Sequence, residues 1–217
     1  MQLDELSNLI KARHSIRRWQ NKEVPLELLK KAVDLATWAP NGGNKQNWRF
    51  YIITNSNTIN SIADEVQNTT NQMASWPEAR EFVADVDKWR ERAGFFRSAP
   101  AAIAVSASQY ISEADKILGA REKFDPEASK MRVWRNSANT KIQSVASAIA
   151  YLLLILHQMG LGAVWMTGPI QAKGNLEKLL GVPSHMDLVA FIPIGYPGET
   201  PVIRGRRPVE EVIEIIS

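Results

Sequence analysis

The chain has 217 residues, of which 45% are hydrophobic and 23% charged, proportions typical of a globular protein with one sizeable core. Lysine and arginine number 26 against 23 aspartates and glutamates, so the broad basic face of a nucleic-acid-binding protein is not expected. The absence of cysteine excludes disulfides, thiolate nucleophiles and cysteine-ligated metals.

The first half of the chain alternates helical and extended patterns. Residues 2–12 favour a short amphipathic helix, and the basic segment RHSIRRW at 13–19 begins where that helix ends. The pattern of 25–39 predicts a helix with Pro25 in its first turn, which is ended by Pro40 and the following NGG. Further predicted elements are a strand at 48–54, a polar helix at 56–69, a helical region at 76–97 and a central strand at 99–108.

The second half begins with a charged stretch at 109–135 that has no clear period and contains Pro126, so we expect a surface excursion with some helix. Residues 137–159 predict a long helix that is apolar on nearly all sides towards its end, which indicates either a central core helix or a subunit interface. Its most apolar stretch, 145–156, is too short to span a bilayer. The remaining predicted elements are a strand at 160–168, a short helix at 171–183 and a last core strand at 186–198.

These elements predict one domain over 1–217, with variable excursions at about 65–98 and 109–135 and a C-terminal arm at about 198–217. The first twenty residues carry no apolar signal-peptide core. We therefore expect a soluble, cytoplasmic protein without a nucleic-acid or membrane partner. The pattern alone leaves open whether the sheet is parallel or antiparallel.

Several common active-site motifs are absent from the sequence. There is no phosphate loop of the GxxxxGK[ST] type, no GxSxG nucleophile elbow and no HExxH zinc helix. The three histidines stand far apart, with no ligand partner at metal spacing, so no metal site is expected. GLGAVW at 160–165 lacks the third glycine of a dinucleotide loop and follows a helix rather than a strand.

Two stretches remain that suit ligand binding. Arg13, Ser15 and Arg17 alternate, so in an extended backbone they point to one side and suit a phosphate monoester. NGGNKQNW at 41–48 combines glycines, which allow close approach of the backbone, with amides that read the edge of a ring. Each stretch also has an ordinary structural interpretation, as a solvated helix end and as a turn.

Four regions together resemble the flavin-dependent nitroreductase family: ARHSIRRW at 12–19, APNGGNKQNWRFYIIT at 39–54, GLGAVWMTG at 160–168 and IPIGYPGETPVIRGRRPVEEV at 192–212. The resemblance implies an α+β, nitroreductase-like fold with a mixed, mostly antiparallel sheet flanked by helices. It also implies an intertwined homodimer that exchanges its C-terminal arms and holds FMN at the subunit interface. Helix 137–159 would then be buried partly against its twin.

The implied reaction is a ping-pong hydride transfer from NADH or NADPH, through flavin N5, to a nitroaromatic, quinone or similar electron-poor acceptor. The chemistry would be carried by FMN, with no catalytic residue from the protein. The alternatives are a narrower reaction on the same fold, such as enone reduction, reductive dehalogenation or flavin breakdown, and a flavin-binding protein without turnover.

The resemblance also implies which residues bind the cofactor, in three groups. The phosphate and pyrimidine group is Arg13, His14, Ser15, Arg17, Arg204 and Arg206; the loop from the other subunit is Pro40, Asn41, Gly42, Asn44 and Gln46; the main chain near N5 is Thr167 and Gly168. The Asn and Lys that contact the flavin in one branch have no match between Glu91 and Arg97. Four aromatic side chains are candidates either for a lid over the acceptor or for ordinary helix packing: Trp76, Trp89, Phe95 and Phe96.

Overall fold

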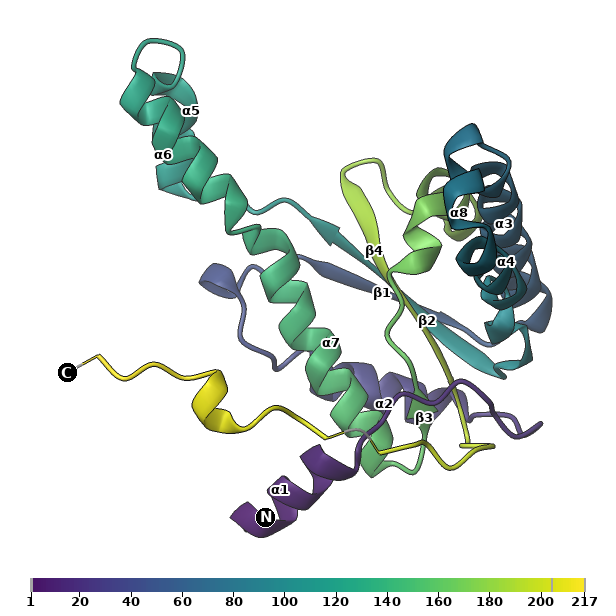
Figure 1. Ribbon diagram of the computed structural model, residues 1–217. Coiled ribbons are helices and arrows are strands. Elements are labelled where there is room, and N and C mark those ends of the chain that lie inside the picture. The colour runs from purple at the N-terminus through teal and green to yellow at the C-terminus, as the bar shows by residue number, and fades with distance from the viewer. Residues whose placement is uncertain (1, 204, 217) are drawn as a thin grey trace.

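The computed structural model describes residues 2–203 and 205–216, which form helices on both faces of a four-stranded sheet of order β1-β2-β4-β3 (Figure 1). Every pairing between the described strands is antiparallel, so the predicted α+β fold with a mostly antiparallel sheet is confirmed and the parallel alternative is wrong. The strands are β1 (Trp48–Ile53), β2 (Ala101–Ser108), β3 (Gly162–Ala163) and β4 (Met186–Gly195). The helices are α1 (Leu3–Ala12), α2 (Leu26–Ala36), α3 (Ser56–Ala74), α4 (Val83–Arg92), α5 (Glu113–Arg121), α6 (Pro126–Ser137), α7 (Thr140–Gln158) and α8 (Lys173–Leu180).

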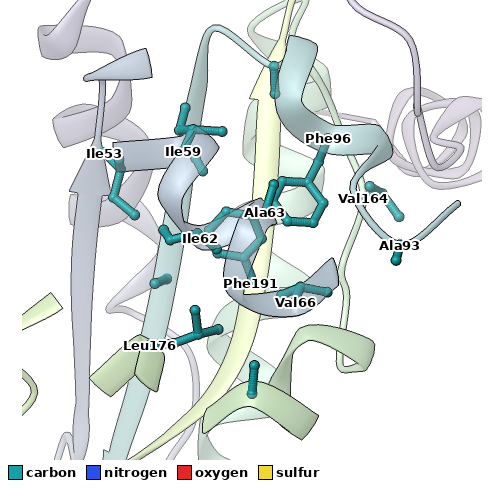
Figure 2. Packing of buried hydrophobic residues seen from close by; sticks show 14 of the residues in the cluster. Ile53, Ile59, Ile62, Ala63, Val66, Ala93, Phe96, Val164, Leu176 and Phe191 are labelled. Atoms are coloured by element: carbon teal, nitrogen blue, oxygen red, sulfur yellow. The ribbon is translucent and has the colours of Figure 1, made fainter. Parts of the chain in front are cut away.

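The sheet separates two apolar cores, because successive side chains of a strand point to opposite faces. In β2, Ala102 and Ala104 belong to the core beneath α3 and α8, whereas Ile103 and Val105 belong to the core beneath α2 and α7. Figure 2 shows the first core around Phe191, whose ring centroid lies 4.9 Å from that of Phe96. Since β2 is buried on both faces, its sequence is mainly small and apolar, as predicted, with Ser106 as a buried polar residue.

The strand predicted at 160–168 is much shorter in the structure, and its ladder with β4 is interrupted. Gly162 and Ala163 pair with β4 in regular register, and Met166 rejoins Phe191 in an isolated bridge. Between them the chain passes Pro193, which has no N–H to donate. The chain nevertheless stays beside β4 as far as Met166, since Val164 donates to the carbonyl of Pro193 (3.4 Å) and Met166 exchanges two hydrogen bonds with Phe191 (3.0 Å each), and it leaves the sheet only after Met166.

The excursion at 109–135 is more regular than expected, since α5 and α6 form a hairpin that projects from the body (Figure 1). Pro126 is the first residue of α6 and follows the N-cap Asp125, so it begins a helix instead of interrupting one. Pro25, by contrast, is itself the N-cap of α2 and lies just before the first turn, not within it as predicted. The region 76–97 contains α4 between the short 3₁₀ turns η2 (Pro77–Phe82) and η3 (Phe95–Ser98).

The predicted long helix at 137–159 is α7, which packs on α2 and the sheet with Val145, Ile149 and Leu152 buried. Asn139, at φ 43°, separates it from α6. By length and composition alone, the combined stretch Pro126–Gln158 could cross a membrane, a test that the core helix of a soluble protein also passes. After Gly198 the chain leaves the body as an arm containing only the short turn η5 (Val209–Glu211) among its described residues.

Candidate functional site

The basic segment 13–19 is held in an extended form between β3 and the end of β4. The N–H of Ile16 donates to the carbonyl of Ala163 (3.1 Å), and the indole N–H of Trp19 donates to the carbonyl of Gly162 (2.9 Å). Ile16 and Trp19 are buried, whereas Arg17 and Arg18 are exposed. The apolar side chains thus anchor the segment to the sheet and leave the basic side chains facing outwards.

The start of the arm lies against this segment through one carboxylate. Glu199 Oε1 accepts hydrogen bonds from the main-chain N–H groups of Arg17 (2.5 Å) and Arg18 (3.1 Å). The N–H of Gly198 also donates to the carbonyl of Arg18 (2.9 Å). Segment and arm therefore run together, and the side chains of both reach the same space.

That space is a cavity of about 640 Å³. Its lining combines the predicted phosphate residues with the arm and one residue of α4: Arg13, His14, Ser15, Arg17, Arg92, Glu199, Thr200, Pro201, Val202 and Arg206. Five predicted cofactor residues are thus brought together, namely Arg13, His14, Ser15, Arg17 and Arg206. The sixth of that group, Arg204, lies outside the described residues.

The cavity suits a ligand with a phosphate group. Arg13, Arg17 and Arg206 can each donate charge-assisted hydrogen bonds, and the hydroxyl of Ser15 adds a neutral donor. Within the described chain the buried Nε2 atom of His14 has no hydrogen-bond partner, as expected of a polar atom placed for a ligand. Burial, and then the positive charge of Arg13, lower the pKa of His157, which favours its neutral form.

The predicted flavin loop, 40–46, is not among the residues that line this cavity in the described chain. It has a preset shape, because Gly43, Asn44 and Gln46 all adopt positive φ, at 60°, 50° and 47°. The side-chain oxygen of Asn41 accepts from the N–H of Gln46 (2.9 Å), and its amide donates to the carbonyl of Ala39 (3.2 Å). Asn41 therefore shapes the loop with both ends of its amide.

Helix α7 fixes this loop to the body. The hydroxyl of Ser147 donates to the carbonyl of Pro40 (2.6 Å), and the N–H of Gly42 donates to Ser144 Oγ (3.3 Å). A Cβ added to Gly42 would lie 3.6 Å from the ring of Tyr110. The loop is thus positioned by hydroxyl groups of α7 and by an aromatic ring at the base of the α5–α6 hairpin.

The third predicted group, Thr167 and Gly168, follows the interruption of β3. Both residues are exposed, and a Cβ added to Gly168 would meet no heavy atom within 4 Å. Neither residue lines the cavity. The predicted cofactor residues therefore occupy three separate places on this chain, of which only the phosphate group forms a described cavity.

Sequence reasoning missed Arg92, the last residue of α4. The resemblance implies an Asn and a Lys near this position, and the chain has an arginine there instead. Phe96 is fully buried, and Phe95 stacks on Trp19 with ring centroids 6.2 Å apart. Phe96 packs in the core, so helix packing is the correct interpretation for it, whereas Phe95 is half-buried and also lines a cavity.

The fold is α+β, and it forms a cavity lined by four arginines among its described residues. Residues 10–196 match the sequence profile described as "Nitroreductase family". The chain therefore belongs to the nitroreductase family.

Two relatives and one solved structure illustrate the family's range. A Methanothermobacter thermautotrophicus protein provisionally named NADH dehydrogenase/NAD(P)H nitroreductase is 30% identical over 90% of this chain and 78% of its own length. The iodotyrosine deiodinase of Thermotoga neapolitana is 28% identical over 96% of this chain and 95% of its own. A Desulfitobacterium hafniense nitroreductase with bound FMN, at 18% identity, matches the fold with a TM-score of 0.72 over 100% of both chains.

Proposed function

We propose that this chain is an FMN-dependent oxidoreductase that takes electrons from NADH or NADPH and passes them, in a ping-pong reaction, to a nitroaromatic, quinone or similar electron-poor acceptor. The observation that carries the proposal is the single cavity that gathers Arg13, Ser15, Arg17 and Arg206. FMN as the ligand is supported by the family and by the FMN named in the Desulfitobacterium structure. NAD(P)H as the donor is supported by the name of the Methanothermobacter relative.

In this proposal the chain's own residues bind FMN and orient it. Arg13, Ser15 and Arg206 would hold the phosphate by charge-assisted hydrogen bonds. Arg17 adds a fixed positive charge to the same cavity, and such a charge stabilises the negative charge that reduction adds to a ligand. The open main chain at Gly168 admits close approach of a flat ring. When bound, FMN supplies the hydride chemistry at its N5 atom.

The absorption spectrum of the purified protein tests this proposal. Blue and near-ultraviolet flavin bands should bleach on addition of NADH or NADPH and return on addition of a quinone or nitroarene. A colourless protein that does not take up added FMN would contradict the proposal. Unbleached bands with both nucleotides would leave a flavin-binding protein that uses another reductant or none.

Reductive dehalogenation is the second candidate function, and the deiodinase relative favours it. In that reaction two electrons and a proton replace the carbon–halogen bond with carbon–hydrogen and release halide. Anaerobic incubation of the reduced protein with iodotyrosine, followed by measurement of iodide, separates the two candidates. Iodide release at one equivalent per two electrons would support dehalogenation. Nitroarene turnover without iodide release would support the first proposal.

We also propose that the protein works as a homodimer with exchanged arms. An apolar groove of about 600 Å³ lies between α1, α2 and α7, lined by residues that include Leu9, Leu35 and Ile155. The arm carries exposed apolar side chains, among them Val212 and Ile213, which a second copy of the groove would cover. Light scattering of the full chain and of a chain ending at residue 198 tests this. A monomeric full chain would contradict it.

We propose further that the protein is cytoplasmic and has no nucleic-acid or membrane partner. Salt-dependent binding of RNA by a protein without flavin would contradict the absence of a nucleic-acid partner. Sedimentation of the protein with lipid vesicles would contradict the absence of a membrane partner.

A further inference from the structure

A second cavity, of about 430 Å³, adjoins the phosphate cavity. Its lining includes Arg17, Arg18 and Arg92, with Phe95 and Ser98. Arg17 and Arg92 line both cavities, so a ligand in one space lies next to a ligand in the other. The second cavity is therefore placed to receive a molecule that meets the bound cofactor.

The guanidinium groups around this second cavity have no ion-pair partner among the described residues. Within residues 2–203 and 205–216, the guanidinium groups of Arg17, Arg18 and Arg92 make no hydrogen bond or ion pair. Glu199, the nearby carboxylate, is used by main-chain N–H groups. Three like charges around one space repel one another, and an anion relieves that repulsion.

The neighbouring arginines show that this arrangement is particular to Arg92. Arg90 donates to Asn71 Oδ1 (3.2 Å) and lies 3.9 Å from Asp87, and Arg97 pairs with Asp64 at 2.7 Å. Arg90 therefore connects α4 to α3, and Arg97 connects η3 to α3. Arg92, between them, points to the two cavities instead.

The second cavity also has an aromatic wall residue, Phe95. Phe95 stacks on the buried Trp19, with ring planes 11° apart, and meets Phe96 edge to face at 5.9 Å between centroids. A flat apolar body fits beside such a ring, while its anionic group reaches the guanidinium forks. The hydroxyl of Ser98 adds a neutral donor at the same place.

We propose that Arg92, with Arg17 and Arg18, forms a second anion subsite, which binds the carboxylate or phosphate of a flat molecule that reacts at the cofactor. The proposal rests on the proposed function, since it assigns the second ligand of the same site. Two sources can supply the anionic group: a carboxylate on an aromatic acceptor, or the pyrophosphate of the nicotinamide donor.

The first experiment titrates the FMN-loaded protein with benzoate and with neutral benzamide, following the flavin spectrum. In Arg92→Gln the dissociation constant of benzoate should rise about tenfold, the value of one charge-assisted hydrogen bond at an exposed site, with less than about a twofold change for benzamide. Arg92→Lys should restore part of the benzoate affinity that Arg92→Gln loses. Arg90→Gln, which removes the same charge from α4 away from both cavities, should leave both constants unchanged.

The second experiment identifies a donor pyrophosphate as the source. Stopped-flow reduction is compared for NADH and for N-benzyl-dihydronicotinamide, which lacks the pyrophosphate. A loss in Arg92→Gln that is confined to NADH would support the subsite and assign it to the donor, whereas a loss confined to benzoate assigns it to the acceptor.

Two results would overturn the subsite. One is unchanged benzoate binding and unchanged NADH reduction in Arg92→Gln. The other is an equal weakening of benzoate, benzamide and FMN itself, which would make Arg92 a cofactor contact. Because benzoate binding needs no turnover, a flavin-loaded protein that binds benzoate through Arg92 but resists reduction by NADH and NADPH would keep the subsite and contradict the proposed donor.

Discussion

The substitution Gly162→Ala tests how the basic segment is anchored. A Cβ at this position would lie 2.6 Å from Ile16 Cγ1, 2.8 Å from Ile16 Cβ and 2.9 Å from Ile16 Cγ2. Carbon atoms in van der Waals contact are about 3.5–4.0 Å apart, so the overlap is about 1 Å with a buried side chain. Because Ile16 also donates its N–H to Ala163, it cannot retreat without weakening that hydrogen bond.

We expect Gly162→Ala to lower the free energy of unfolding by about 2 kcal/mol, within the usual cost of overpacking a core. For a chain of this length that corresponds to a fall of roughly 4–8 °C in the melting temperature. Displacement of Ile16 also moves the neighbouring Ser15 and Arg17. The FMN dissociation constant should therefore rise roughly tenfold, the equivalent of one weakened charge-assisted hydrogen bond.

Thermal unfolding and the fluorescence of released FMN measure the two effects. Gly174→Ala in α8 is the matched control, since its added Cβ meets nothing within 4 Å and should be neutral or stabilising by up to about 1 kcal/mol. Adding Ile16→Ala removes two of the three close contacts, so the double variant should lose less stability than the two single variants together. A Gly162→Ala protein as stable as the parent would refute the reasoning.

Four further predictions follow from contacts in the core, the cavity, the loop and the hairpin. Arg13→Ala should weaken FMN binding by roughly 1.5–3 kcal/mol in an equilibrium titration, and parent-like retention of FMN would remove Arg13 from the phosphate site. Ser147→Ala removes the hydroxyl that holds the carbonyl of Pro40 and should speed hydrogen exchange in the loop 40–46; unchanged exchange would mean that the loop is held elsewhere. Phe191→Ala should cost about 3–5 kcal/mol in urea unfolding, and a cost near zero would show that the core collapses around the gap. Hydrogen bonds from Arg135 and then Ser112 hold the pKa of Asp115 well below its usual range, so this carboxylate stabilises the fold above about pH 4 and the contribution fades as the pH falls further. The urea midpoint of Asp115→Asn should therefore decline less steeply than the parent's from about pH 4 downwards, and parallel curves would argue against it.

The central strand β2 was predictable because its burial is visible in its own local sequence. β2 is buried on both faces, and a strand buried on both faces reads as a continuous apolar run. The early end of β3 was not predictable in the same way. It depends on Pro193, thirty residues further along the chain, which comes opposite residue 164 only when the sheet has formed.

In the candidate site, too, some features were predictable from the sequence and others depend on tertiary packing. The alternation of Arg13, Ser15 and Arg17 indicated a shared ligand, and the resemblance brought in the arm residue Arg206, which the structure places at the same cavity. The part played by Arg92 could not be inferred, because Arg90, Arg92 and Arg97 look alike in the sequence. Only the packing of α4 and η3 decides which of the three faces the cavity.

The use of Glu199 has a kinetic consequence. Its carboxylate holds the arm by accepting main-chain N–H groups, and the five described arginines that line the two cavities outnumber it, so the field around them stays positive. Such a field attracts anionic molecules from solution and raises their association rate, and dissolved ions screen it over about 10 Å at 0.1 M ionic strength. Added salt should thus slow the arrival of anionic ligands far more than it speeds their departure.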